Sequence, residues 1–274
     1  MISFPNAKVN LGLNIVGVRP NGYHDLETVF YPIELCDVLE IVPSRSGKTT
    51  LECYGRKVDC PMEKNLVYKA FELMRKEFDV PAVEMYLYKH IPDGAGLGGG
   101  SSDASSALKM LNAIFSLGLS DDDLAKRAAT LGADCPFFIY NKPLKATGIG
   151  DVFAPVELSL AGKTMLLVKP DVSVSTKLAY SKVVPAPADC ALESLLAKPM
   201  TEWNGTVKND FEQSVFAEFP ELAVIKAGLI EAGAAYAAMS GSGSAIFGIF
   251  DNAKMAEKAA EKVEKYNHFV IALH

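Results

Sequence analysis

The sequence predicts an α+β protein built from two lobes. Its 274 residues exceed the usual size of one domain, although a single large domain is the alternative. Stretches with β-strand alternation come first, helices with clear start signals follow, and strands and helices alternate again from about residue 155. We therefore expect an N-terminal lobe over residues 1–155 and a C-terminal lobe over residues 156–274.

Composition and charge exclude several classes of protein. Hydrophobic residues make up 49% of the chain and charged residues 22%, which is typical of a folded soluble protein and not of a disordered one. The net charge of −6 argues against a general grip on nucleic-acid backbones, but a few local cations are enough to hold a small anionic ligand. The five cysteines are scattered without a C-x-x-C pair, which indicates reduced thiols in the cytosol.

No targeting or membrane segment is expected. The N-terminus, "MISFPNAKVN", has no basic start followed by an apolar run, so a secretory signal is not predicted. Residues 232–250 are uncharged, but glycines and serines interrupt them, and we expect a tight turn between two buried segments there. These features predict a cytoplasmic protein that binds neither membranes nor nucleic acid.

Several β-strands are expected in the first third of the chain. They lie around "AKVNLGLNIVG", "DVLEIVP" and "AVEMYLYKHI". In the last of these segments Val83, Met85 and Leu87 alternate with other residues and share one face. Asn21 and Gly22 form a typical hairpin turn, which predicts that the first strand is followed by a second one.

Two helices are expected next. Apolar residues from Ala104 to Phe115 recur at helical spacing and give a wide apolar stripe. A second helix begins at Ser120, which has an acidic residue three positions later as in a capping box, and it ends at Gly132.

The remaining elements complete the α+β pattern. "CPFFIY", residues 135–140, is expected to be extended. Beyond it we expect a strand at "TMLLVKP", a helical region after Ser175, a helix near "FPELAVIKAGLIEAG", a strand at "SAIFGIF" and a helix at "NAKMAEKAAEKVEKY".

The segment "PDGAGLGGGSSDASSAL", residues 92–108, joins a predicted strand to a predicted helix and indicates a phosphate site. Glycine lets the main chain approach a ligand closely, and the free N–H groups and dipole at a helix start attract anions. Several donors in one small space suit a polyphosphate. The alternative is a flexible loop that ends in a serine cap.

Other glycine motifs fit this sequence less well. The pattern G-x-G-x-x-G is present, but the acidic residues about 20 positions later, 121–123, lie at a helix start and not at a strand end as in dinucleotide-binding proteins. A Walker loop at "SGKTT" fails because Val42 occupies the position of its first glycine. A hydrolase nucleophile at Ser102 would depend on His268 as its base.

Four segments together resemble the GHMP kinases in their order and spacing. They are "PNAKVNLGLNI…NGYHDLETVF", "PDGAGLGGGSSDAS", "LGADCPFF" and "MSGSGSAIFGIF". The triple glycine and double serine before Asp103, with "GYH" near the N-terminus, are most similar to the 4-diphosphocytidyl-2-C-methyl-D-erythritol kinases. The resemblance spans nearly the whole chain and implies a two-lobed GHMP-kinase fold with the active site in the cleft between the lobes.

This resemblance implies ATP-dependent phosphorylation of the 2-hydroxyl of 4-diphosphocytidyl-2-C-methyl-D-erythritol, in the non-mevalonate route to isoprenoid precursors. The ATP phosphates would lie on the glycine-rich turn, and Asn65 and Lys89 would serve the adenosine side. Mg²⁺ is expected with ATP because it prefers oxygen ligands and neutralises phosphates. Its protein ligand is left open between Ser101, Ser102 and Asp103. The implied nucleotide-binding residues are Asn65, Lys89, Gly94, Ala95, Gly96, Leu97, Gly98, Gly99, Gly100, Ser101 and Ser102.

The resemblance also assigns catalytic and substrate residues. By position in "LGADCPFF" and "NAKVN", Asp134 and Lys8 match the family's catalytic carboxylate and its partner lysine. A carboxylate near a hydroxyl accepts or orients its proton, and an adjacent ammonium keeps that carboxylate ionised. A structural ion pair is the alternative. The implied substrate residues are Tyr23, His24 and Tyr180 around the cytosine, Asn10 and Asn14 at hydroxyl or phosphate groups, and Gly241 and Ser242 in a closing turn.

Two other functions stay open. One is a GHMP kinase that acts on a sugar or another polyol, which would lack a cytidine pocket at Tyr23, His24 and Tyr180. The other is a GHMP-fold protein that binds nucleotide without catalysis, against which the presence of both Lys8 and Asp134 argues. The oligomeric state is not predicted.

Overall fold

The computed structural model describes residues 1–58 and 60–274. Contacts divide this chain into two compact units, each assembled from separate stretches of sequence. Unit 1 comprises Met1–Ala7, Leu35–Asp93 and Gly98–Lys142, and unit 2 comprises Lys8–Glu34, Gly94–Leu97 and Pro143–His274. These units differ from the expected lobes, 1–155 and 156–274, because two stretches of the N-terminal half pack with the C-terminal half.

Unit 1 contains a four-stranded sheet in the order β1-β4-β6-β5. β4 runs antiparallel to β6, whereas β5 runs parallel to it. The expected strands at "DVLEIVP" and "AVEMYLYKHI" are confirmed, and Val83, Met85 and Leu87 are buried on one face as predicted. The strands are β1 (Ile2–Ser3), β4 (Val38–Pro43), β5 (Thr50–Gly55) and β6 (Val83–Lys89).

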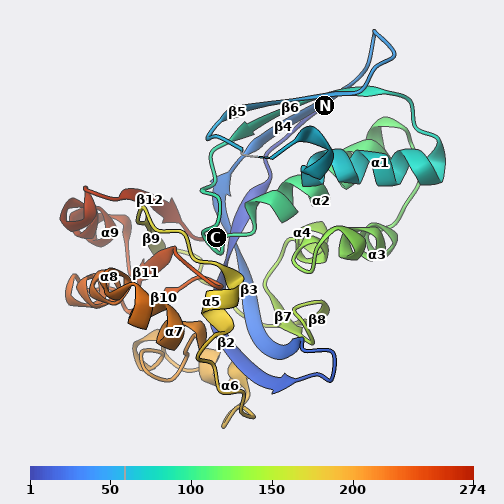
Figure 1. Cartoon of the computed structure of the whole chain (residues 1–274). Helices are drawn as coiled ribbons and strands as arrows, with labels where there is room; N and C mark the ends of the chain where they lie inside the picture. Colours follow the sequence, from blue (N-terminus) through green and yellow to red (C-terminus); the bar gives the residue numbers. More distant parts are fainter. Residues whose placement is uncertain (59) are drawn as a thin grey trace. The chain divides into compact units, whose positions relative to one another are not determined.

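Helices α1 and α2 cover one face of this sheet and pack against each other (Figure 1). Their apolar stripes meet the inward residues of β4 and β6 in one continuous core. The helix expected after the glycine-rich segment is therefore confirmed. The helices of unit 1 are η1 (Met62–Lys64), α1 (Leu66–Phe78), α2 (Gly99–Ile114), α3 (Asp121–Leu131) and α4 (Cys135–Tyr140).

Helix α3 begins and ends as predicted, but α4 corrects an expectation. The side chain of Ser120 accepts the Asp123 N–H and the Asp123 carboxylate accepts the Ser120 N–H, which completes a capping box. The expectation of extended structure over residues 135–140 is wrong, because this segment is helical. Its apolar run is too short to show a period, and Pro136 lies in the first turn, where a missing N–H costs no hydrogen bond.

Two further four-stranded sheets lie mainly in unit 2. One has the order β2-β3-β7-β8, and the other, fully antiparallel, has the order β10-β11-β9-β12. The predicted turn within residues 232–250 is confirmed, since it joins β10 to β11. The strands are β2 (Asn6–Val18), β3 (His24–Cys36), β7 (Leu144–Thr147), β8 (Val152–Pro155), β9 (Thr164–Lys169), β10 (Tyr236–Met239), β11 (Ile246–Phe250) and β12 (Asn267–Ala272).

Helices α8 and α9 pack on the β10-β11-β9-β12 sheet and close the core of unit 2. The expected helix after Ser175 is confirmed as α5, whose first turn is capped by the Ser175 hydroxyl. Within the described ranges, no helix combines the length and apolarity needed to cross a bilayer. The helices of unit 2 are α5 (Thr176–Tyr180), α6 (Leu192–Leu196), η2 (Met200–Glu202), α7 (Phe211–Glu218), α8 (Pro220–Glu231), α9 (Ala253–Ala260) and η3 (Glu261–Val263).

Candidate active site

The first half of the glycine-rich segment, Gly94–Leu97, is held by the turn between β10 and β11. The hydroxyl of Ser240 donates to the carbonyl of Gly96 at 2.9 Å, and the Ala245 N–H donates to the carbonyl of Ala95 at 3.2 Å. Gly96 has φ +74°, and a Cβ atom there would overlap the carbonyl oxygen of Ser240. Only glycine allows this approach, so the two small-residue motifs form one structure.

The predicted residues Lys8 and Asn10 lie beside these turns in unit 2. The Lys8 ammonium donates to Asn10 Oδ1 at 2.7 Å, and both side chains are buried. Asn10 Nδ2 in turn donates to Thr28 Oγ1 at 2.9 Å. A Cβ atom on Gly241 would lie 3.3 Å from Asn10 Oδ1, and the Lys8 N–H donates to the carbonyl of Leu97. Unit 2 therefore brings three of the recognised motifs into contact.

Asn209 supports the same turn and was not found by sequence reasoning. Its Nδ2 donates to the carbonyls of Met239 and Gly241, each at 2.8 Å, and its Oδ1 accepts the Phe211 N–H at 3.0 Å. The side chain is buried, so its hydrogen bonds hold the turn before Ser242 in place. No pattern in "TVKND" distinguishes this asparagine from one in a solvated loop.

Two of the three aromatic residues predicted to hold cytosine are in contact. The rings of His24 and Tyr180 have centroids 4.5 Å apart at an interplanar angle of 34°. Phe211, which sequence reasoning missed, contacts Tyr180 edge-on, with centroids 4.7 Å apart. Tyr23 is 59% exposed, so its ring is available to a planar ligand.

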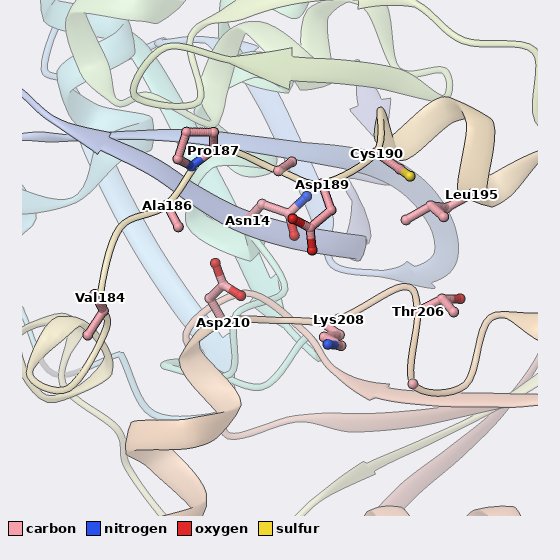
Figure 2. A pocket seen from close by; sticks show the side chains of 12 residues that line it. Asn14, Val184, Ala186, Pro187, Asp189, Cys190, Leu195, Thr206, Lys208 and Asp210 are labelled. Carbon is pink, nitrogen blue, oxygen red and sulfur yellow. The ribbon is translucent and has the colours of Figure 1, made fainter.

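Asn14 lies in a cavity of about 400 Å³ in unit 2, outside the hydrogen-bond chain of Lys8 and Asn10. Figure 2 shows its amide directed into this cavity together with the carboxylates of Asp189 and Asp210. The Asp210 carboxylate also accepts the N–H of Ile15, which follows Asn14 on β2, at 2.7 Å. The structure therefore groups Asn14 with a set of polar residues that the motifs did not indicate.

The second half of the glycine-rich segment begins helix α2 in unit 1. Gly98 is its N-cap, with φ +71°, and the Ser102 N–H is the first to bond back to it, at 2.9 Å. The geometry of an α-helix leaves the N–H groups of the first turn without an acceptor inside the helix. The N–H groups of Gly99, Gly100 and Ser101 are thus the donors that an anion would use.

A buried charged cluster lies behind this helix start. The Lys89 ammonium donates to Asp37 and, at 2.6 Å, to Asp103, and each of the three side chains is at most 3% exposed. Burial alone lowers the pKa of Lys89, but the two carboxylates outweigh it and raise this pKa above its usual value. Burial raises the pKa of Asp103 to about 7, against the opposing effect of Lys89. Lys89, predicted to serve the adenosine side, is thus enclosed beneath the helix.

Asp134 lies at the N-cap of α4, also in unit 1, and is half-buried. Its segment is joined to α2 by the Ser105 hydroxyl, which lies 2.7 Å from the carbonyl of Cys135 and 2.9 Å from that of Ser101. Burial raises the pKa of the Cys135 thiol to about 11. Unit 1 thus contains the predicted catalytic carboxylate and the helix start, while Lys8 belongs to unit 2.

Asn65 has a structural task that is independent of any ligand. It is the N-cap of α1, and its Oδ1 accepts the Val67 N–H at 2.9 Å. Its Nδ2 lies 3.9 Å from Cys53 Sγ on β5. A role toward adenosine stays a prediction for this residue.

The helix start suits Mg²⁺ only if nucleotide phosphates supply most of the ligands. The described residues contain no group of three His, Cys, Asp or Glu side chains arranged to hold a metal. Mg²⁺ commonly keeps several waters and uses one or two protein oxygens besides phosphates. The carboxylate of Asp103 is enclosed with Lys89, which argues against it, and Ser102 is buried. Ser101, half-buried in the first turn, is the residue that fits.

Comparison with known proteins agrees with these observations. Residues 65–142 match the GHMP kinases N terminal domain, and residues 191–268 match the GHMP kinases C terminal region. The chain is 54% identical to the 4-diphosphocytidyl-2-C-methyl-D-erythritol kinase of Bacteroides fragilis over 91% of this chain and 92% of that protein. It is 48% identical to the protein of the same name from Porphyromonas gingivalis, over 95% and 96%.

Solved structures give the same result. A crystal structure of 4-(cytidine 5'-diphospho)-2C-methyl-D-erythritol kinase superposes with a TM-score of 0.84 at 33% identity, covering 100% of this chain and 99% of that one. A mevalonate kinase superposes with a TM-score of 0.75 at 13% identity, covering 100% and 99%, which shows a shared fold alone.

Proposed function

We propose, since the chain belongs to the GHMP kinase family, that it transfers the γ-phosphoryl group of ATP to the 2-hydroxyl of 4-diphosphocytidyl-2-C-methyl-D-erythritol. One observation carries this proposal: proteins named as kinases of this compound are 40–54% identical to the chain over more than nine-tenths of its length. The contacts among the glycine-rich segment, the β10–β11 turn and Lys8 support it. A cytoplasmic location, and the absence of membrane and nucleic-acid partners, stay predictions within this proposal.

The nucleotide phosphates would lie on the main-chain donors of the glycine-rich segment. Phosphoryl transfer depends mainly on alignment and on stabilisation of charge, so fixed N–H groups at a helix start are suitable partners. The first-turn N–H groups of α2 provide them. When bound, Mg²⁺ neutralises charge on the β- and γ-phosphates, with the Ser101 hydroxyl as its protein ligand.

Asp134 and Lys8 are the residues that would act at the acceptor hydroxyl. Asp134 accepts or orients the hydroxyl proton, which makes the oxygen a better nucleophile. Lys8 is held in place by Asn10 and supplies a positive charge that favours the ionised carboxylate and the developing oxyanion. These roles rest on the motif positions and on the fixed side chain of Lys8.

The cytidine group would be recognised by the aromatic residues of unit 2. A cytosine ring can stack on Tyr23, while the His24 and Tyr180 pair forms a wall and Phe211 packs edge-on against Tyr180. The imidazole of His24 offers a hydrogen-bonding edge to the base. This set of rings is what favours a pyrimidine nucleotide over a simple polyol.

The test is release of ADP from ATP with each of three acceptors. We expect turnover with 4-diphosphocytidyl-2-C-methyl-D-erythritol and none with mevalonate or homoserine. Turnover with only one of the other acceptors would replace the proposed substrate within the family. Binding of ATP without turnover of any acceptor would favour a nucleotide-binding protein that lacks catalysis.

A further inference from the structure

The cluster of Lys89, Asp37 and Asp103 in the core of unit 1 calls for a reason other than stability. Removing charges from water costs free energy that an ion pair regains only with good geometry, and apolar side chains of similar size often stabilise a core as well or better. In the described part of the chain, Asp103 Oδ1 is buried without a hydrogen-bond partner, which is a further cost. Stability alone therefore does not account for this arrangement.

The positions of these residues in the sheet make the same point. Val83, Met85 and Leu87 occupy the core-facing positions of β6, and Lys89 is the next residue in that register. On the neighbouring strand β4, core-facing Leu39 and Ile41 are preceded in the same register by Asp37. Apolar side chains would continue both patterns. The charged residues Lys89 and Asp37 instead lie together at the same end of the two paired strands.

That place is the start of α2. A Cβ atom on Gly99 would lie 3.4 Å from Lys89 Nζ, so the ammonium lies directly against the first residue of the helix. Asp103 belongs to the next turn of the same helix. Asp37 also accepts the N–H groups of His90 and Ile91, at 2.5 and 2.8 Å, where the chain leaves β6. The cluster therefore ties the end of β6 to the first turns of α2.

We propose that Lys89, held by Asp37 and Asp103, is a positioning residue for the nucleotide phosphates. It fixes the first turn of α2, and its ammonium offsets the negative charge of two carboxylates that would otherwise repel phosphates at the N–H groups. Lys89 acts through the helix and does not itself touch the nucleotide. This inference rests on the proposed kinase function, because it assumes that phosphates occupy the helix start.

The decisive measurement is the gain in affinity that phosphates confer. Isothermal titration calorimetry gives Kd for adenosine and for ADP. The ratio of Kd for adenosine to Kd for ADP measures the affinity that the phosphates add, separately from the rest of the site. For Lys89→Met we expect this ratio to fall about tenfold, a loss of about 1.4 kcal/mol, since the helix start is no longer fixed and the carboxylates beneath it lose their cation. In steady-state assays KM for ATP rises, while KM for the cytidine substrate is unchanged.

Lys145 provides a matched control in unit 2. Its ammonium also lies between two carboxylates, those of Glu27 and Glu193, each at 2.7 Å. Lys145→Met removes a lysine held by two carboxylates in the other unit, in a cluster more exposed than that of Lys89, so we expect a lower Tm and an unchanged ratio of the two Kd values. A ratio lowered equally in both variants would show a general effect of lost stability and would overturn the proposal.

A second variant guards against failure of Lys89→Met to fold. In Lys89→Met/Asp103→Asn the new amide can donate to Asp37, so no carboxylate is left without a donor. A folded double variant with the wild-type ratio would overturn the proposal, and a reduced ratio supports it. Wild-type protein that binds ADP no more tightly than adenosine would instead refute the phosphate site of the proposed function, and this inference with it.

Discussion

Gly96→Ala tests whether the glycine-rich segment and the β10–β11 turn form one structure. Gly96 has φ +74°, and an added methyl group would overlap the carbonyl oxygen of Ser240. This oxygen belongs to the main chain and cannot rotate away as a side chain would. The turn must therefore move, and the hydrogen bonds from Ser240 to Gly96 and from Ala245 to Ala95 are the contacts at risk.

The expected cost is larger than that of left-handed backbone alone. An alanine in the left-handed region costs about 1–2 kcal/mol. Each lost hydrogen bond costs about 1 kcal/mol more. Gly162→Ala is the matched control, because Gly162 has φ +81° in the same unit but no atom within 4 Å of an added Cβ. We expect Gly96→Ala to lose about 2 kcal/mol more than this control, since both variants share the backbone cost.

Urea denaturation of both variants measures the free energy of unfolding, and calorimetry with ADP measures the effect on the site. Gly162→Ala is expected to bind ADP as the wild type does, whereas Gly96→Ala binds it more weakly because the main-chain donors shift. Equal losses of stability in the two variants would refute the close approach of the two turns. Unchanged ADP binding in a destabilised Gly96→Ala variant would show that the position of this turn does not affect phosphate binding.

Three further predictions concern the acceptor side and the buried thiol. Asp134→Asn is expected to keep binding of ATP and substrate but to lower kcat by about 100-fold or more, because an amide cannot take the hydroxyl proton; turnover at the wild-type rate would rule out the assigned role. Tyr180→Ala is expected to raise KM for the cytidine substrate about tenfold, since stacking on a base contributes about 1–3 kcal/mol; an equal rise in KM for ATP would contradict a pocket specific for cytosine. Cys135 is expected to resist maleimide in the folded protein near neutral pH, because it is buried and its pKa is raised to about 11, while the exposed Cys190 reacts; mass spectrometry of the labelled peptides decides, and prompt labelling of Cys135 would contradict its burial.

Local patterns in the sequence predicted those parts of the fold that depend on neighbouring residues. The alternation of Val83, Met85 and Leu87 predicted β6, and the spacing of Ser120 and Asp123 predicted the start of α3. Both signals lie within a few residues, so no other part of the chain is needed to interpret them. The failure at residues 135–140 has the same origin, since six apolar residues fit a buried strand as well as a buried helix.

Contacts between distant segments were not predictable in this way. The expected boundary near residue 155 assigned β2 to the N-terminal lobe, but Leu13 and Ile15 lie in the same core as Leu166 and Phe250. Alternation along β2 shows that one face is buried without showing what covers it. Asn209 is a similar case, because its partners Met239 and Gly241 lie 30 and 32 residues away and no local pattern indicates the pairing.

The burial of Lys89 can be predicted from the sequence, but its partners cannot. The core-facing register of β6 is legible from Val83 onward, and continuing it by two positions past Leu87 places a lysine in the interior. A buried ammonium needs hydrogen-bond acceptors or an opposite charge, so this register alone predicts that polar partners exist. Their identity depends on the pairing of β4 with β6, which brings in Asp37, and on the rotation of α2, which brings in Asp103. Under the proposed function, the inward charge next to this glycine-rich helix start is what points to a support for the phosphates, and the strand pairing identifies the partner Asp37.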